Sequence, residues 1–379
     1  MALKIAIIGG SLGGLFAAVL LDRAGFDVRV FERSRAGLDG RGAGLVAQRP
    51  VFRLLREIGC DHVARIGVTA WERIFLDRDG TVRHRDRTPQ TQVSWDLIWH
   101  SLRAALPEGR YAIGRVVEAV SQGPDEVTVR FADGARVSAD LVIGADGLGS
   151  VLRAAVAGAS ARPVYAGYAA WRGLVPEATL VDEATLLSER FAFFEMQGSQ
   201  ALGYLVPGAD GSVELGQRRY NWVWYRPAPG QAGLAAALTD RDGQRHAHSL
   251  PPGAMSDHAV DQLRADAARL LPPAFARVVR AEPAPFVQAI HDLRSPRMAA
   301  GRIALLGDAA FVARPHTAMG VAKAAADAMA LRDWLVRQPD PVAALGGYDR
   351  ERRDENDATV TLGIRLGRHL QPAIPSALE

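Results

Sequence analysis

The feature that most constrains the fold is a glycine-rich turn near the start of the chain, Gly9-Gly10-Ser11-Leu12-Gly13-Gly14. The apolar run 4–8 before it is typical of a buried parallel strand, and the Ala/Leu-rich stretch 14–24 after it has a helical pattern. A second apolar run follows at 28–32. Strand, turn, helix and strand make a βαβ unit with a right-handed crossover. The sequence therefore predicts an α/β fold with a Rossmann-like domain.

The same turn has the features that a dinucleotide needs. Gly9 permits a tight turn, Gly14 lets helix and strand pack closely, and the helix N-terminus offers free N–H groups to a pyrophosphate. Ser11 stands where the fingerprint G-x-G-x-x-G has its middle glycine. Glu32, at the end of the second strand, is placed to bond a ribose hydroxyl, which suits FAD or NAD. The alternative is a glycine-rich turn without a ligand.

Two later turns also follow apolar strands. Asp146-Gly147 comes after the run 140–143, and Gly307-Asp308 comes after the run 303–306. An aspartate such as Asp308 can accept a hydrogen bond from a sugar-like hydroxyl. Taken alone, each turn is better explained as an ordinary strand end or helix cap.

Composition excludes several classes of function. Among 379 residues, 45 Lys and Arg stand against 42 Asp and Glu, and the basic clusters are interleaved with acids, so no nucleic-acid footprint is expected. Cys60 is the sole cysteine and cannot form an intrachain disulfide. The apolar stretch 12–21 is too short to cross a bilayer and does not resemble a secretory signal. We therefore expect a cytoplasmic protein without a membrane partner, and no His/Cys/Asp spacing indicates a metal site.

The pattern along the chain predicts interleaved domains. A β-rich, aromatic texture with Asp-Gly turns interrupts the nucleotide-binding pattern, and Tyr220, Trp222 and Trp224 alternate with residues of the opposite sheet face. We predict a discontinuous Rossmann-like domain over 1–70, 100–165 and 285–335. A β-rich substrate domain would occupy 71–99 and 166–284, and a C-terminal helical segment would follow at 336–379.

Together these motifs resemble a known family. The turn GGSLGG with Glu32, the segment GADG and the segment LLGDAA with Pro315 occur in the order and spacing of the single-component (group A) FAD-dependent aromatic hydroxylases. Within that group the chain is most similar to the 2,6-dihydroxypyridine 3-hydroxylase and 6-hydroxynicotinate 3-monooxygenase type. Three segments carry that likeness: Gly9-Gly10-Ser11, residues 168–173 and Arg314-Pro315-His316.

The resemblance implies which residues hold FAD. Asp146 and Gly147 would lie near the pyrophosphate and the nicotinamide path, and Asp308 on the ribityl chain. The segment 41–48 is similar to the loop beside the flavin, and the segment 315–320 to the loop that contacts the isoalloxazine. The full set of cofactor residues implied in this way is Gly9, Ser11, Gly14, Glu32, Arg33, Arg41, Gln48, Asp146, Gly147, Asp308, Pro315 and Gly320.

The chain departs from the family pattern at three places. Ser11 replaces a glycine, and Ser94 stands where an R-x-D-L helix start usually has its arginine. The second change leaves open which cation neutralises the pyrophosphate. The segment 315–320 reads PHTAMG where many members have P-x-x-G-Q-G.

The resemblance also implies a reaction. NADH or NADPH would reduce FAD, O₂ would add to give a flavin C4a-hydroperoxide, and this would hydroxylate a small electron-rich aromatic or N-heteroaromatic ring. His316 is our candidate for the base beside the substrate, with Tyr204 as the second candidate. Candidate walls of the substrate site are Trp171, Phe193, Trp222 and Trp224. Each of these residues could instead be part of the sheet core or support only the loop backbone.

Other functions stay open on the sequence alone. A flavin reductase or oxidase on the same scaffold would consume NAD(P)H without oxygenating a ring. An FAD-loaded redox sensor would bind the cofactor without turnover. A homodimer is common among similar proteins, but the sequence leaves the oligomeric state undecided, along with the identity of the ring and the choice between NADH and NADPH.

Overall fold

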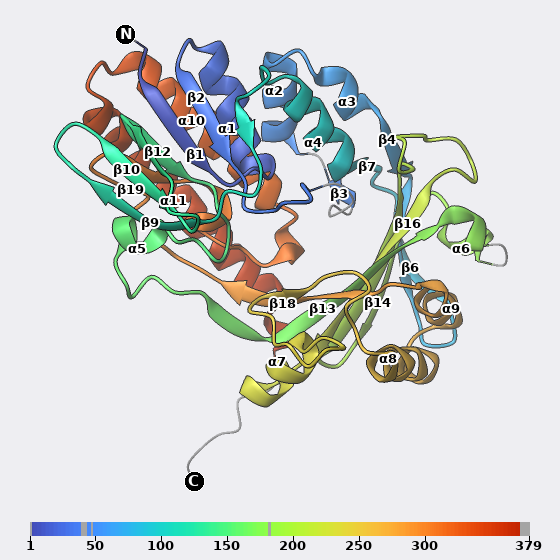
Figure 1. Ribbon diagram of the computed structural model, residues 1–379. Helices are drawn as coiled ribbons and strands as arrows, with labels where there is room; N and C mark the ends of the chain where they lie inside the picture. Colours follow the sequence, from blue (N-terminus) through green and yellow to red (C-terminus); the bar gives the residue numbers. More distant parts are fainter. Residues whose placement is uncertain (1, 39–43, 47, 181–182, 372–379) are drawn as a thin grey trace.

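The computed structural model describes residues 2–38, 44–46, 48–180 and 183–371. Figure 1 shows a parallel sheet and its helices in the upper half of the view and a long, mainly antiparallel sheet in the lower half. Blue, green and red segments lie together in the upper half, so distant parts of the chain build this parallel-sheet domain. The predicted α/β fold with an interleaved β-sheet domain is confirmed.

The parallel-sheet domain is centred on the first strand of the chain. Ile5 of this strand pairs in parallel with Val28 on one side and with Leu141 on the other. All three side chains are buried, because helices cover both faces of such a sheet. The sheet has the order β19(Ala299–Ala300), β20(Ile303–Leu305), β12(Leu141–Gly144), β1(Lys4–Ile8), β2(Asp27–Phe31), β8(Tyr111–Ala112).

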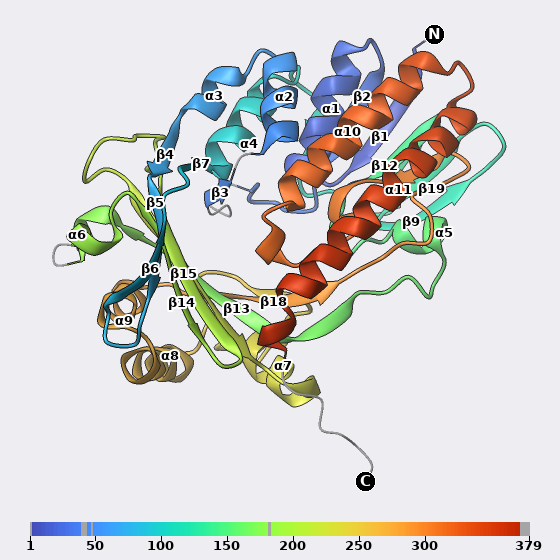
Figure 2. The ribbon, with the colours of Figure 1, turned by 180° about the vertical axis from the view of Figure 1, so that it is seen from behind.

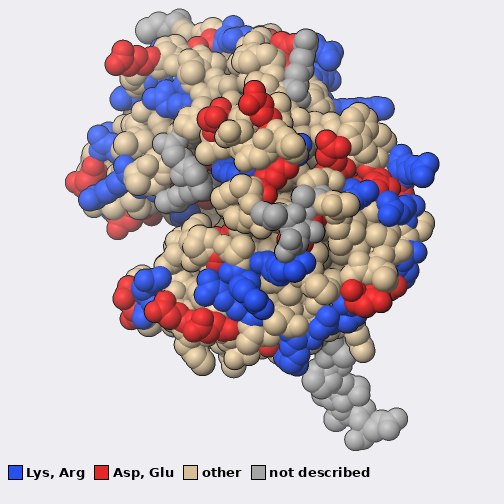
Figure 3. Space-filling model, turned by 90° about the vertical axis from the view of Figure 1, so that its right-hand side faces the viewer, with Lys and Arg blue, Asp and Glu red and all other residues tan. Residues whose placement is uncertain are grey.

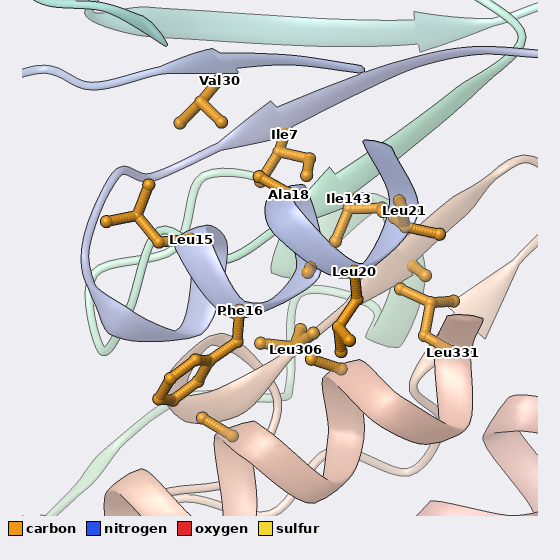
Figure 4. Close-up of a cluster of buried hydrophobic side chains, with 14 of the residues drawn as sticks. Ile7, Leu15, Phe16, Ala18, Leu20, Leu21, Val30, Ile143, Leu306 and Leu331 are labelled. Carbon is orange, nitrogen blue, oxygen red and sulfur yellow. The ribbon is translucent and has the colours of Figure 1, made fainter. Parts of the chain in front are cut away.

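Helices from opposite ends of the chain form the core on this sheet. Phe16 and Leu20 of α1(Leu12–Arg23) point towards α10(Gly320–Arg337), whose Leu331 lies in the same buried cluster (Figure 4). Helix α11(Pro341–Leu366) packs on α10, as Figure 2 shows from behind. The remaining helices of this half are α2(Arg49–Glu57), α3(Asp61–Arg65), α4(Trp95–Ala104) and α5(Arg153–Ala157).

The large-sheet domain is an eight-stranded sheet among the described residues. Its one parallel contact joins β14 to β5, so an early segment of the chain is added beside a late one. In order across the sheet, the strands are β17(Ser249–Leu250), β18(Phe286–Asp292), β13(Val164–Pro176), β16(Arg219–Pro227), β15(Ser199–Val206), β14(Arg190–Met196), β5(Glu72–Leu76), β6(Val82–Asp86).

Smaller elements complete the two domains. The helices α6(Ala184–Leu187), α7(Gly230–Leu238), α8(Asp257–Leu270) and α9(Pro273–Ala281) belong to the large-sheet half. Short 3₁₀ turns occur at 177–179, 307–309, 315–317 and 368–370. Two three-stranded sheets have the orders β3(Gly44–Val46), β7(Gln90–Ser94), β4(Gly67–Ala70) and β11(Arg136–Ala139), β10(Val127–Phe131), β9(Val117–Gln122).

Two local predictions are corrected by these contacts. Strand β18 lies in the large sheet, paired with β13, although the range 285–335 had been assigned to the Rossmann-like domain. Helix α4 packs on α1, so the boundary predicted at residue 99 falls before this helix instead.

Figure 3 shows cationic and anionic side chains interspersed over the face that lies at the right-hand side of Figure 1. Within the described ranges, no helix combines the length and the apolar character needed to cross a membrane.

The contact between α10 and α11 depends on a missing side chain at Gly347. A Cβ atom there would lie 2.3 Å from Cε3 of Trp334, whereas a Cβ on the adjacent Gly346 would lie 3.6 Å from the nearest atom, on the flexible Arg350. We expect Gly347→Ala to lower the free energy of unfolding by about 1–3 kcal/mol through overpacking. Gly346→Ala should raise it by about 0.5–1 kcal/mol, because alanine favours the helix. Urea unfolding of both variants tests this, and equal effects would contradict it.

Candidate active site

The glycine turn after β1 can exist only without side chains at two positions. Gly9 has φ +110°, and a Cβ atom on it would lie 2.2 Å from the carbonyl oxygen of Ala145. A Cβ on Gly14 would lie 1.9 Å from the carbonyl oxygen of Gly9. The turn is therefore in direct contact with the segment 144–147 after β12. Two motifs that are far apart in sequence meet at one edge of the sheet.

Gly10 is fixed from three directions. Its carbonyl accepts hydrogen bonds from Trp99 Nε1 (2.9 Å) and from the Tyr111 hydroxyl (3.0 Å), and its N–H donates to Glu32 Oε2 (2.8 Å). Sequence reasoning missed both aromatic residues, since nothing in their local pattern relates them to the turn. Ser11 has φ −77° and ψ −178°, which any residue adopts, and its exposed hydroxyl caps no helix N–H. Serine is therefore tolerated here without strain.

Glu32 is buried and organises the turn through its carboxylate. Besides Gly10, the N–H of Ser34 donates to its Oε1 (2.8 Å). Each carboxylate oxygen can accept further hydrogen bonds, so a ribose hydroxyl can still bind. The neighbouring Arg33 is exposed at the same strand end. The acidic residue thus shapes the cradle as well as offering a ligand contact.

The second motif contains a buried carboxylate with a free oxygen. Asp146 accepts the N–H of Val151 at Oδ2 (2.8 Å), while Oδ1 is buried and has no hydrogen-bond partner among the described residues. Burial raises the pKa of this carboxyl group. Gly147 follows with φ +73°. An orphaned buried oxygen next to the glycine turn marks a place where a ligand hydroxyl or N–H is favoured.

Arg153 connects the second motif to the third. Its buried guanidinium donates to the carbonyl oxygens of Leu148 (2.7 Å) and Ala309 (3.2 Å). Asp308, beside Ala309, has a side chain that is 54% exposed. Its carboxylate is therefore presented to the outside of the fold and is available to a ligand. Arg153 was missed because an arginine after a turn carries no signal in one sequence.

The third motif leads into the loop 315–320. Gln48 Nε2 donates to the carbonyl oxygen of Ala318 (3.0 Å) and so connects the segment 44–48 to this loop. Pro315 and Gly320, at the ends of the loop, are both exposed. Arg41, the remaining predicted cofactor residue, lies outside the described residues.

His316 is held against the large sheet. Its Nε2 lies 2.8 Å from the hydroxyl of Tyr168 on β13, and its ring centroid lies 4.6 Å from that of Tyr225 on β16. Arg314, two residues earlier, forms a buried ion pair with Asp292 at 2.7 Å. Burial, together with the charges of His369 and Arg314, lowers the pKa of His316 to about 4. The imidazole is therefore neutral near pH 7.

The sheet face beside His316 is aromatic. Phe191 and Phe193 stack with centroids 4.5 Å apart, and the ring of Tyr204 lies 4.6 Å from that of Phe191. Leu202 packs both on this group and on the group that contains Tyr168 and Tyr225, so one continuous surface results. Tyr204 donates its hydroxyl to the carbonyl oxygen of Gly44 (3.0 Å).

The prediction that three tryptophans line the substrate site is wrong. Trp171, Trp222 and Trp224 lie on the opposite face of the sheet, in the core formed with α8 and α9. Trp222 and Trp224 are 1% exposed. Their period-2 spacing was recognised correctly, but the helices that cover their face decide that they belong to the core.

The residues described here fit FAD. The glycine cradle has no room for side chains, the first turn of α1 carries no acidic residue, and the carboxylates of Glu32 and Asp308 can meet hydroxyl groups. A family model for an FAD binding domain-like region matches residues 165–292. A second model, for an NAD(P)-binding Rossmann-like domain, matches residues 7–55.

Relatives of known activity cover nearly the whole chain. The 2,6-dihydroxypyridine 3-monooxygenase of Paenarthrobacter nicotinovorans is 31% identical over 97% of this chain and 91% of its own length. The chain belongs to the single-component FAD-dependent aromatic hydroxylases. This hydroxylase family uses FAD as its cofactor and NAD(P)H as its co-substrate.

Two further comparisons agree with the family. The 6-hydroxynicotinate 3-monooxygenase of Bordetella bronchiseptica is 30% identical over 86% of this chain and 81% of its own length. The solved structure of 2,6-dihydroxypyridine-3-hydroxylase from Arthrobacter nicotinovorans superposes with a TM-score of 0.91 at 30% identity, covering 99% of this chain and 96% of that one. The resemblance stated from the motifs is confirmed.

The glycine cradle yields a matched pair of variants. Gly14→Ala places a Cβ 1.9 Å from a backbone oxygen, whereas Gly13→Ala places one 3.1 Å from the flexible end of Leu306. Overpacking of about 1–3 kcal/mol at the cradle should weaken FAD binding about tenfold or more for Gly14→Ala. Gly13→Ala should retain FAD. Fluorescence titration of the apoprotein with FAD measures both, and equal affinity would refute this account of the turn.

Proposed function

We propose that this hydroxylase acts on a small, electron-rich ring of the hydroxypyridine or hydroxybenzoate type, with NAD(P)H and O₂ as co-substrates. The observation that carries the proposal is the 2.8 Å contact between His316 of the loop 315–320 and Tyr168 of the large sheet. It holds the loop against a continuous aromatic surface, so a planar ring bound on that surface lies next to the loop.

FAD, when bound, supplies the redox and oxygen chemistry. The chain has to orient the ring and exclude water. Phe193 is partly buried and stacks on Phe75 and Phe191, so it offers a ring edge for packing against an aromatic substrate. Gly367, at the end of α11, covers the His316–Tyr168 pair so closely that a Cβ there would lie 2.8 Å from the imidazole. The C-terminal helix therefore helps to close the site.

The neutral state of His316 defines what it can do. An imidazole whose pKa is about 4 is a weak base at neutral pH, but it has a lone pair that accepts a hydrogen bond. In the tautomer whose Nε2–H donates to Tyr168, Nδ1 is the acceptor and can bind a hydroxyl of the substrate. Such a bond orients the substrate ring. It also polarises the substrate O–H bond, which raises the electron density of the ring without creating a buried imidazolium.

Tyr204 has a different role from the one first considered. Its hydroxyl donates to Gly44, and burial raises its pKa, so the phenol stays protonated. We assign it to holding β3, which leads from the flavin-side loop, against the sheet. It is therefore not our candidate for the proton acceptor.

Polar groups on the same sheet face favour a substrate with hydrogen-bonding substituents. Asn221 on β16 lies opposite Tyr204 on one side and opposite Leu174 of β13 on the other. Arg172 is two residues before Leu174, so it lies on the same face of the sheet. Both polar atoms of the Asn221 amide lack a hydrogen-bond partner in the described part of the chain, and so does Nε of Arg172. Buried groups of this kind are costly when unpaired, so a ligand carbonyl, hydroxyl or ring N–H is favoured.

The substrate class is tested by NADH and NADPH oxidation with the FAD-loaded protein. A panel of hydroxypyridines, hydroxynicotinates and hydroxybenzoates is supplied, and products are identified by mass. We expect one class to stimulate oxidation about tenfold or more and to gain one oxygen, since substrate binding completes the site. Unstimulated oxidation across the whole panel would overturn the proposed substrate class. Stimulated oxidation without oxygen gain would identify a reductase or oxidase instead.

The role of His316 is tested by His316→Ala in comparison with His316→Gln, which keeps an acceptor. We expect His316→Ala to lower kcat by about 10- to 100-fold through loss of the hydrogen-bond acceptor that positions the ring, and His316→Gln to recover part of it. FAD content from the visible spectrum controls for loss of the cofactor. Full turnover in both variants would remove His316 from the reaction.

The same residue contributes to the pH dependence of stability. In the unfolded chain a histidine binds a proton near pH 6.5, whereas His316 in the folded protein does so only near pH 4. Because the unfolded state binds more protons in this window, stability falls as the pH decreases from about 6.5 to about 4. Denaturant unfolding at several pH values should show a shallower decrease for His316→Gln.

A further inference from the structure

A cleft of about 490 Å³ lies on the outer side of the parallel-sheet domain. It runs between α2 and α11 over the surface of α10, three helices that lie side by side in Figure 2. Its floor is apolar, formed by Pro50, Met319, Ala322, Ala326 and Met329. Its walls carry four cationic side chains and one carboxylate, namely Arg49, Arg53, Lys323, Arg352 and Glu355.

The cations of this cleft outnumber their counter-charges. Arg352 is paired with Asp327 and Glu355, and the Lys323 ammonium lies 3.9 Å from Asp327. Arg49 and Arg53 form no ion pair or hydrogen bond with any described residue. Two guanidinium charges are thus left at the rim without a partner.

The position of these cations is unfavourable for the helices themselves. Arg49 is the first residue of α2, and Lys323 lies in the first turn of α10, where the positive ends of the helix dipoles already lie. Neither first turn contains an acidic residue. Arg49 and Arg53, four residues apart, also repel each other on one helix face. A bound anion would interact favourably with both helix dipoles and would offset the repulsion between the two arginines.

Lys323 gives a second, independent indication. Its side chain is 1% exposed, and its Nζ has no hydrogen-bond partner in the described chain, although two carboxylates lie at 3.9 Å. A buried ammonium with three unused donors carries a desolvation cost that an anion in the cleft would offset.

We propose that this cleft binds a phosphate monoester with a small apolar body. The two unpaired guanidinium charges match a dianion, and guanidinium groups bond phosphate oxygens in pairs. The apolar floor accommodates the ester group. The site lies outside the region assigned to the ring substrate, and its existence does not depend on the proposed hydroxylation.

The cleft also contacts the cofactor region through one side chain. Lys323 lies 3.9 Å from Asp308, the residue assigned to the ribityl chain, and Met319 of the loop 315–320 forms part of the cleft floor. An anion that attracts Lys323 would weaken its pairing with Asp308. Binding of an anion in the cleft would therefore change the charge pairing of Asp308.

Calorimetric titration of the FAD-loaded protein at low salt tests the site. FAD occupies the pyrophosphate position, so inorganic phosphate and phenyl phosphate can report on the cleft. We expect both to bind, phenyl phosphate more tightly, and Arg53→Gln to weaken both about tenfold through loss of charge-assisted hydrogen bonds. Binding should weaken further in Arg49→Gln/Arg53→Gln and with added salt.

Arg56→Gln is the matched control, since it removes the same charge from an exposed position of α2 that does not line the cleft. It should leave both affinities unchanged. The proposal is overturned if neither compound binds the wild-type protein, or if Arg53→Gln and Arg56→Gln have the same effect. Equal binding of phosphate and phenyl phosphate would overturn the apolar part of the ligand.

Discussion

The arrangement of the cofactor end of the molecule depends on one buried carboxylate, Asp327 on α10. It is fully buried and accepts hydrogen bonds from the N–H of Gly307 (3.1 Å), Arg352 Nε (2.9 Å) and Asn356 Nδ2 (3.0 Å). A single group therefore joins the Gly307-Asp308 turn, α10 and α11. Removing one partner of a buried ion pair costs about 3–5 kcal/mol. The outward presentation of Asp308 rests on this network, because the turn that carries it is anchored there.

Two polar contacts of the segment 314–316 join the parallel-sheet domain to the large sheet. The Arg314–Asp292 pair attaches the segment before Pro315 to the end of β18, and the Tyr168–His316 contact attaches the next residues to β13. The loop 315–320 is thus held between the parallel sheet and the large sheet. In a hydroxylase the distance between cofactor and ring must be constant, and this loop connects the residues assigned to each.

The parts of the site that the sequence predicts are those whose geometry is local. Gly9 is required by its own φ of +110°, and Gly14 by the carbonyl oxygen of Gly9 five residues earlier, so the fingerprint carries its own physical reason. Trp99, Tyr111 and Arg153 support the same motifs from distant positions, and no local pattern indicates them. The prediction that the tryptophans line the substrate site is wrong for a related reason. Alternation defines two sheet faces, but which face meets the helices is decided by α8 and α9, far along the chain.

The departure PHTAMG in the loop 315–320 now has a structural meaning. Ala318 has φ +53°, in the left-handed region, at the position where many family members have glycine. An alanine there costs about 1–2 kcal/mol, and the hydrogen bond from Gln48 to its carbonyl holds that conformation. The loop therefore keeps the backbone shape that glycine would adopt freely, but with fewer alternative conformations. A stiffer loop beside the cofactor favours one position for His316, which is what a neutral hydrogen-bond acceptor needs in order to orient a ring.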